Sequence, residues 1–221
     1  MSSGTHIRRR GRPRLTEPTP EYLERREAII AAAIRAFHLH GYDAASLDDV
    51  AAELDIRKAS LYHYIESKAY LLYLIFDRAI SQGLQRLEQI STLPDPRERL
   101  AAMITHQVEL VAEEPSLFAV FFGNRPRLSS EYEADMLAKE RRYARHFIEA
   151  VDFAVKEGVI TPVDPKYAAH ALLGLTSWIY KWFSPEVDDW QEVARNFVRL
   201  VLGSDVSVDL SKMTIDAASA K

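Results

Sequence analysis

Residues 26–72 decide the fold; they read REAIIAAAIRAFHLHGYDAASLDDVAAELDIRKASLYHYIESKAYLL. The first part places apolar side chains at the i, i+3, i+4, i+7 spacing of one helical face, and Gly41 stands where a helix C-terminus is expected. Ser46 then provides an N-cap, with Asp49 three residues later in a variant of the capping box. The two apolar stripes are Ile30, Ala33, Ile34 and Phe37, then Leu47, Val50, Ala51 and Leu54. This pattern predicts one helix ending at Gly41 and a second of about two turns.

A third short helix is predicted after the tight break DIRK at residues 55–58. Leu61 and Ile65 are four residues apart, so both lie on its buried face. The opposite face and its flanks offer cationic, methyl, phenol and imidazole groups to bases or phosphates: Arg57, Lys58, Ala59, Tyr62, His63 and Lys68. Two short helices joined by a tight turn are typical of a helix-turn-helix, whose later helix enters the major groove of DNA. The alternative is an ordinary bundle that happens to contain short helices.

The rest of the chain also has a helical pattern. Tyr70 to Phe76 are seven consecutive apolar residues, which predicts a helix buried on several sides that connects the N-terminal unit to a larger body. Prolines and Gly158 separate further helices predicted at 97–113, 115–123, 129–157, 165–183 and 188–203. We therefore expect an all-α protein with a flexible basic arm (1–20), a helix-turn-helix DNA-binding domain (21–66), a helical ligand-binding and dimerisation domain (67–203) and a loose tail (204–221).

Composition narrows the functional classes. The 221 residues, 48% of them hydrophobic, are enough to bury a substantial core. The chain has no cysteine, and its seven histidines follow no metal-ligand spacing such as HExxH, so we expect neither an enzyme nor a metal or cofactor site. Neither a secretory signal nor an apolar run of about 18 residues occurs, which predicts a cytoplasmic protein without membrane contact.

The order of these signals resembles the DNA-binding domain of the TetR family of transcriptional repressors: Gly-Tyr after the first helix, Ser before the second, then Leu-Tyr-His before Ser-Lys. The resemblance implies a homodimer that reads a near-palindromic operator in double-stranded DNA and a C-terminal domain that binds a small-molecule effector. It also implies contacts to bases or phosphates from Arg57, Lys58, Ala59, Tyr62 and His63, to phosphates from Ser46, Ser60 and Lys68, and a place near the DNA backbone for Tyr64. Many members have His then Phe where this chain has Tyr64 and Ile65.

The N-terminal stretch RRRGRPRL, residues 8–15, is strongly basic in a chain whose formal net charge is -4. Its RGRPR core is similar to an AT-hook, in which an extended Gly-Arg-Pro lays arginines along a narrow minor groove. This predicts DNA contacts from Arg8, Arg9, Arg10, Arg12 and Arg14. The alternative is a solvated basic tail without a ligand.

The C-terminal helices carry the remaining predictions. In the resemblance the last two helices form a four-helix bundle with a second copy, which predicts a dimer interface at Trp178, Trp182, Phe197 and Val201. Bulky apolar groups with a few polar groups nearby predict a small-molecule pocket, lined by Met103, His106, Phe118, Phe121, Phe122, Arg125, Arg142, His146, Phe147 and Trp178. A closed aromatic core is the alternative for any one of these residues.

Two C-terminal segments, LLGLTSWIYKWFSP and RRYARHFIEAVDFAVKEGVI, are loosely similar to the branch of the family that governs lipid and fatty-acyl catabolism. This favours a hydrophobic or acyl-CoA-type effector whose acidic end lies near the arginines. The alternatives are a multidrug-type repressor that responds to aromatic ligands and an architectural DNA-binding protein without an effector.

Overall fold

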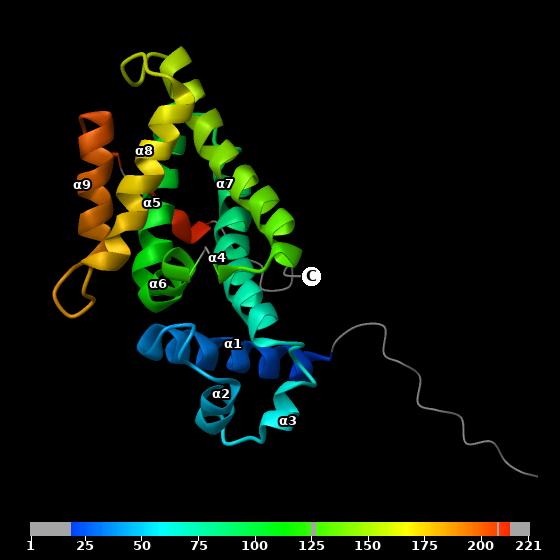
Figure 1. The fold of residues 1–221 in the computed structure, drawn as a ribbon. Helices are drawn as coiled ribbons and strands as arrows, with labels where there is room; N and C mark the ends of the chain where they lie inside the picture. Colours follow the sequence, from blue (N-terminus) through cyan, green and yellow to red (C-terminus); the bar gives the residue numbers. More distant parts are fainter. Residues whose placement is uncertain (1–18, 125–126, 207, 213–221) are drawn as a thin grey trace, which may run out of the picture.

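The computed structural model describes residues 19–124, 127–206 and 208–212, and within these ranges every regular element is a helix (Figure 1). The elements are α1 (Pro20–His40), α2 (Leu47–Glu53), α3 (Lys58–Leu61), α4 (Lys68–Ile90), α5 (Pro96–Glu113), α6 (Pro115–Asn124), α7 (Ser130–Lys156), α8 (Pro165–Ser177), the 3₁₀ helix η2 (Trp178–Lys181), α9 (Trp190–Leu202) and the 3₁₀ helix η3 (Leu210–Lys212). Helices α1 to α3 form a small unit at one end, and α4 leads from it into the larger body (Figure 1). The predicted all-α class is confirmed.

Local capping explains the boundaries of the N-terminal helices. The Ser46 hydroxyl accepts a hydrogen bond from the Asp49 backbone N–H at 3.1 Å, and the Asp49 carboxylate accepts one from the Ser46 N–H at 2.7 Å. This reciprocal pair is the predicted capping box at the start of α2. Gly41, with φ +77°, ends α1, and Asp55, with φ +52°, reverses the chain between α2 and α3.

Helix α3 ends at Leu61, although the sequence predicts a helix that continues to Ile65. It has one α-helical turn, after which the Tyr64 N–H donates to the Leu61 carbonyl at 2.8 Å and the Ile65 N–H donates to the same carbonyl at 3.0 Å. The tighter turn brings the chain round to Ser67, the extended N-cap of α4, within a few residues. Leu61 and Ile65 are nevertheless buried as predicted, and Tyr62 is 52% exposed.

The connector α4 is buried on several sides, as its continuous apolar run predicts. Leu71, Leu72, Ile75 and Phe76 are each 0% exposed. They belong to one apolar cluster with Phe37 of α1 and Phe121 of α6, so the core runs without interruption from the small N-terminal unit into the body. A second cluster lies between the C-terminal half of α4 and helices α5, α7, α8 and α9.

The structure differs from the sequence prediction in two C-terminal regions. The helix expected over 165–183 ends at Ser177, where the Thr176 hydroxyl donates to the Leu172 carbonyl at 2.7 Å and the chain tightens into η2. The segment expected to be a loose tail packs on the body over residues 204–206 and 208–212. Leu210 is only 8% exposed within the second apolar cluster, because its side chain covers an apolar surface that the helices leave open.

Candidate DNA-binding surface and ligand cavity

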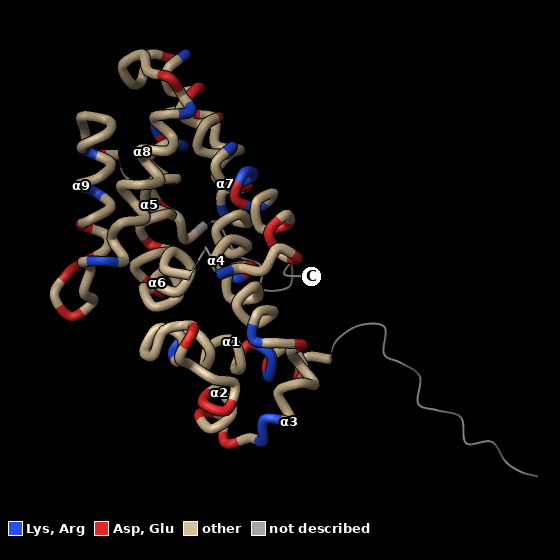
Figure 2. Tube along the Cα trace, in the orientation of Figure 1, with Lys and Arg blue, Asp and Glu red and all other residues tan. Residues whose placement is uncertain are grey.

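The end of the molecule beyond α1 presents the predicted recognition residues. Arg57, Lys58, Ala59, Tyr62 and His63 are exposed, and Ser60 is half-buried. Figure 2 shows basic residues at the start of α3 and acidic residues around α2. The Lys58 ammonium lies 2.7 Å from the Asp48 carboxylate, which raises the pKa of Lys58 and holds the side chain beside the start of α2.

Three other predicted contacts also have structural partners. The Lys68 ammonium lies 4.4 Å from the centroid of the Tyr42 ring and donates to the Asp43 carbonyl at 3.3 Å, so it is held at the start of α4. The Ser46 hydroxyl serves the capping box. The ring of Tyr64 lies 5.0 Å, centroid to centroid, from that of Tyr22, and this contact fixes the end of the turn against α1.

The predicted arm lies outside the described residues, so Arg8, Arg9, Arg10, Arg12 and Arg14 remain a sequence prediction. The described chain begins at Thr19, whose side chain caps α1 by accepting from the Tyr22 N–H at 3.3 Å.

A cavity of about 250 Å³ lies among helices α4 to α8 in the body. Its lining is apolar and aromatic with a few polar groups: Ala79, Ile80, Gln107, Leu110, Phe118, Phe121, Phe122, Glu140, Tyr143, Ala144, Leu173 and Ser177. Three predicted residues of α6 meet there, with the Phe121 and Phe122 ring centroids 5.0 Å apart and those of Phe118 and Phe122 6.1 Å apart. This combination suits a small hydrophobic ligand.

The structure places the other predicted cavity residues elsewhere. Met103 and Phe147 are buried in the second apolar cluster, and Trp178 is 59% exposed. Arg142 pairs with Glu88 at the surface. The His146 Nδ1 lies 2.8 Å from the Ser91 hydroxyl, and burial lowers the pKa of His146. Arg125 lies outside the described residues.

His106 is buried beside the cavity lining but is not part of it. Its Nε2 lies 3.2 Å from the Gly83 carbonyl, and 1% of the residue is exposed. Burial, aided by the nearby Arg86 charge, lowers the pKa of His106 to about 3, so the ring is neutral at physiological pH.

Sequence reasoning missed the polar pair in the cavity wall. The Tyr143 hydroxyl donates to the Gln107 side-chain oxygen, and burial raises the pKa of Tyr143, so the hydroxyl stays protonated. The Tyr143 ring lies so close to α4 that a Cβ at Gly83 would be 2.6 Å from the Tyr143 Cε2. A glycine inside α4 and a glutamine among the apolar residues of α5 were the available signals for this site.

The cavity wall is also joined to the N-terminal unit formed by α1 to α3. Helix α6, which carries the three phenylalanines, packs on α1. Arg78 of α4 lies 3.0 Å from Glu114, just before α6, and 3.4 Å from Glu27 of α1. Beyond α6, Arg127 pairs with Asp43 in the loop after α1 at 2.6 Å.

Helices α8 and α9 and the segment around η2 carry large apolar side chains that are exposed. Tyr167, Trp178, Trp182 and Leu200 are 71%, 59%, 47% and 72% exposed, respectively. Of the predicted interface residues, Phe197 and Val201 are half-buried along α9. Exposed apolar surface on this scale is typical of a protein contact.

Neither a membrane span nor a metal site is found within residues 19–124, 127–206 and 208–212. No helix there is both long and apolar enough to cross a membrane. Nor do three or more His, Cys, Asp or Glu side chains of these residues gather in a way that could hold a metal ion.

An all-helical body behind a helix-turn-helix unit defines a class of DNA-binding regulators, and comparison with known proteins places the chain within that class. The family model described as "Bacterial regulatory proteins, tetR family" matches residues 29–73, and that described as "Tetracyclin repressor-like, C-terminal domain" matches residues 94–204. The chain belongs to the TetR family of DNA-binding transcriptional regulators.

Individual relatives agree with this assignment. AibR, whose crystal structure in complex with isovaleryl coenzyme A and operator DNA was compared with this chain, is 30% identical in sequence to it. The match covers 80% of this chain and 98% of the AibR chain, with a TM-score of 0.74. PfmR from Thermus thermophilus is 29% identical over 79% of this chain and 97% of PfmR, with a TM-score of 0.75. The transcriptional repressor KstR2 of Mycolicibacterium smegmatis is 21% identical over 183 residues, which are 81% of this chain and 89% of KstR2.

Proposed function

We propose that this regulator represses transcription by binding a near-palindromic operator as a homodimer and is released when a small hydrophobic effector enters the cavity among α4 to α8. The observation that carries the proposal is the position of α6. This helix supplies three phenylalanines to the cavity and packs on α1 of the DNA-binding unit. An effector that displaces α6 therefore acts on the unit that carries α3.

The recognition surface of the proposed complex consists of Arg57, Lys58, Ala59, Tyr62 and His63, which are exposed. Ser46, Ser60 and Lys68 would contact phosphates, and Tyr64 would support the turn next to the backbone. The arginine arm would extend the contact into the adjacent minor groove. Phosphate contacts position the protein, and the side chains of α3 and the following turn read the bases.

The homodimer is supported by the exposed apolar side chains of α8, α9 and the segment around η2. Trp178 begins η2, Trp182 directly follows it and Leu200 lies on α9, and all three side chains are exposed. To read two half-sites, a symmetric contact through these side chains would have to hold the two α3 helices about 34–36 Å apart. Light scattering at micromolar concentration should give twice the chain mass of 25.2 kDa. A mass of 25.2 kDa would contradict the dimer.

The acyl-CoA-type effector is supported by the relative AibR, whose structure holds isovaleryl coenzyme A. The cavity of about 250 Å³ is below the range of roughly 300–1,000 Å³ typical of small-molecule sites. It suits a short acyl group, so the nucleotide part of a coenzyme A thioester would lie outside it.

A neutral aromatic ligand is the second candidate effector. Phe118, Phe121 and Phe122 offer ring faces and edges, and Arg142, which was expected to hold an acidic group, pairs instead with Glu88. The described lining contains one carboxylate, Glu140, and no cationic side chain. These features favour an uncharged molecule inside the cavity.

The test begins with selecting an operator from a random duplex library and measuring its affinity by mobility shift. The complex is then titrated with acyl-CoAs of several chain lengths and with neutral aromatic drugs. Release by short acyl-CoAs supports the first effector class, and release by the drugs alone supports the second. Release by neither overturns the proposed effector classes.

Two methionine variants on α7 test whether the effector binds in the cavity among α4 to α8. Ala144→Met narrows the cavity, whereas Arg141→Met places the same side chain on the exposed face of the helix. Release should require a higher effector concentration for Ala144→Met and be unchanged for Arg141→Met. Equal release from both variants would place the effector elsewhere.

A further inference from the structure

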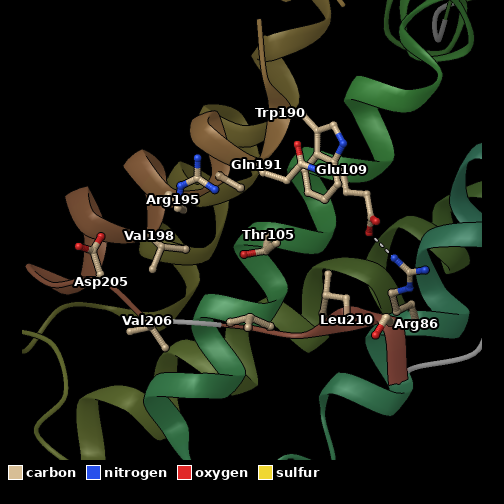
Figure 3. Close-up of a pocket in the computed structure, with 13 residues that line it drawn as sticks. Arg86, Thr105, Glu109, Trp190, Gln191, Arg195, Val198, Asp205, Val206 and Leu210 are labelled. Atoms are coloured by element: carbon tan, nitrogen blue, oxygen red, sulfur yellow. Dashed lines mark hydrogen bonds and ion pairs between the residues drawn. The ribbon is translucent and has the colours of Figure 1, made fainter.

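A second pocket, larger than the effector cavity and sharing none of its lining residues, lies between α5, α9 and a C-terminal segment made of residues 205, 206 and 208–211 (Figure 3). Its volume is about 480 Å³, within the range of roughly 300–1,000 Å³ typical of small-molecule sites. On α9 it is lined by Trp190, Gln191, Ala194, Arg195 and Val198, the face turned toward α5. Leu200, on the proposed dimer face, is not among them.

The C-terminal wall of this pocket is attached on both sides. The Arg199 guanidinium pairs with the Asp205 carboxylate through contacts of 3.0 and 2.9 Å, and Arg97 donates to the Ser204 hydroxyl at 3.0 Å. At the other end of the segment, Leu210 lines the pocket and is buried within the second apolar cluster. These attachments give the pocket a fixed wall on its C-terminal side.

The lining combines a flat aromatic surface with an apolar wall and a polar end. Figure 3 shows the indole of Trp190 on one side, with Val206 and Leu210 on the C-terminal segment. Glu109 and Arg86 form an ion pair at the end near Trp190, and their side chains are only 16% and 15% exposed. The Arg86 Nε is shielded from solvent and has no hydrogen-bond partner among the described residues.

The charges of the lining balance. Arg86 pairs with Glu109. Asp205 pairs with Arg199, and Arg195 pairs with Asp189, so each charged side chain of the lining already has a partner of opposite charge. At the poorly exposed Arg86–Glu109 pair, a charged ligand would have to compete with one member of the pair and lose its own hydration, which is costly. A neutral group that accepts from Arg86 and donates to Glu109 could instead join the pair without breaking it, and the Thr105 hydroxyl can do either.

We propose that this pocket binds a neutral, flat, largely apolar molecule whose polar end both accepts and donates hydrogen bonds, as an aromatic carboxamide does. The ring system lies between Trp190 and the apolar residues of the C-terminal segment, and the amide meets Arg86 and Glu109. The site is separate from the effector cavity and does not depend on the function proposed for that cavity.

The test uses the full chain labelled with 5-fluorotryptophan, whose three fluorine resonances are assigned through Trp190→Phe and equivalent variants. The probe is 2-naphthamide, compared with 2-naphthoate, which has the same rings and a charged end. 2-Naphthamide should shift the Trp190 resonance saturably and bind at least about tenfold more tightly than 2-naphthoate, a difference of about 1.4 kcal/mol. The absence of a saturable shift at millimolar probe would overturn the proposal.

Two methionine variants separate the pockets. Thr105→Met narrows the pocket beside α9 and should abolish the shift, whereas Ala144→Met narrows the effector cavity and should leave it unchanged. Thermal unfolding checks that both variants fold. The opposite result, or an equal effect of both substitutions, would place the probe elsewhere and overturn the proposal.

Glu109→Gln provides a second test, because a purely structural role of the Arg86–Glu109 pair would not change which probe binds more tightly. It removes the negative partner of Arg86, so a carboxylate can then supply the missing charge. The preference should reverse, with 2-naphthoate binding more tightly than 2-naphthamide. An unchanged preference would show that the ligand end does not lie at the Arg86–Glu109 pair.

Discussion

The close approach of Tyr143 to α4 makes Gly83→Ala an informative substitution. A Cβ at Gly83 would lie 2.6 Å from the Tyr143 Cε2, 2.9 Å from its hydroxyl oxygen and 3.0 Å from the Leu110 Cδ2. Favourable carbon contacts lie at about 3.5–4.0 Å, so the ring must move by about 1 Å. Overpacking of this kind costs about 1–3 kcal/mol, which the better helix propensity of alanine offsets by at most about 1 kcal/mol.

Gly123→Ala is the matched control, since the same added methyl group at this α6 position meets nothing within 4 Å. Relative to that control, Gly83→Ala should lower the free energy of unfolding by about 1–3 kcal/mol, or the Tm by about 2–12 °C. Calorimetry measures the difference. In a Tyr143→Leu background the penalty of Gly83→Ala should shrink, because the clashing ring is gone. Equal Tm values for the two alanine variants, or an undiminished penalty in that background, would refute this account of the contact.

Three further predictions address the DNA surface, the arm and a buried histidine. Tyr62→Ala should weaken operator binding by about 1–3 kcal/mol in mobility shifts without changing the Tm. Lys68→Ala should weaken binding and also lower the Tm, because Lys68 contacts Tyr42 and Asp43. If both variants bind the operator as tightly as the native chain, the proposed DNA-binding surface is wrong. Deleting residues 1–15 removes five arginines, so the slope of log affinity against log salt should become shallower by at most several units, and an unaltered slope would exclude arm contacts. The pKa of His106 in the folded chain is about 3, below its ordinary value of 6.5. Between pH 6.5 and pH 3 the unfolded chain therefore binds a proton at His106 that the folded chain does not, so the free energy of unfolding falls as the pH falls. Urea unfolding should show that the free energy of unfolding falls less between pH 6.5 and pH 4.5 for His106→Leu than for the native chain, by up to about 1.4 kcal/mol per pH unit. An equal fall for both proteins would contradict a neutral, buried His106 ring.

The N-terminal unit was predictable because its signals are local. Ser46 and Asp49 are close in sequence and cap the same turn, and Leu61 and Ile65 are buried at the spacing that predicted it. The length of α3 was not predictable in the same way. It depends on how soon the chain must reach Ser67 and begin α4, which is a constraint of tertiary structure.

The cavity was only partly predictable, because adjacent positions on a helix point about 100° apart. Sequence reasoning selected Arg142 and His146 on α7 for their polar groups, but Tyr143 and Ala144 turn toward the cavity instead. The orientation of a long helix within a bundle depends on which neighbours pack on it, and the residues of α7 alone do not specify this. Phe118, Phe121 and Phe122 were found because α6 is apolar on nearly every side.

The tail shows the same limit for long-range packing. Residues 204–212 have few apolar side chains, which by composition favours a loose segment. Leu210 is nevertheless buried against the second apolar cluster, and Arg97 and Arg199 hold the segment on its N-terminal side. The residues that hold this segment in place are far apart in the sequence, so no local sequence pattern predicts the contacts.

The contact between α1 and α6 has a consequence for how an effector would act. The ion pairs between the DNA-binding unit and the body, Arg127 with Asp43 and Arg78 with Glu27, have exposed members and contribute little on their own. The apolar cluster is different, because it includes residues of α1, α4 and α6 that are almost fully buried, and packed interiors resist small independent shifts of one element. If an effector moves α6, α1 must either follow it or lose apolar contact. Under the proposed function, the coupling between effector and operator is therefore carried mainly by apolar packing and only slightly by the surface ion pairs.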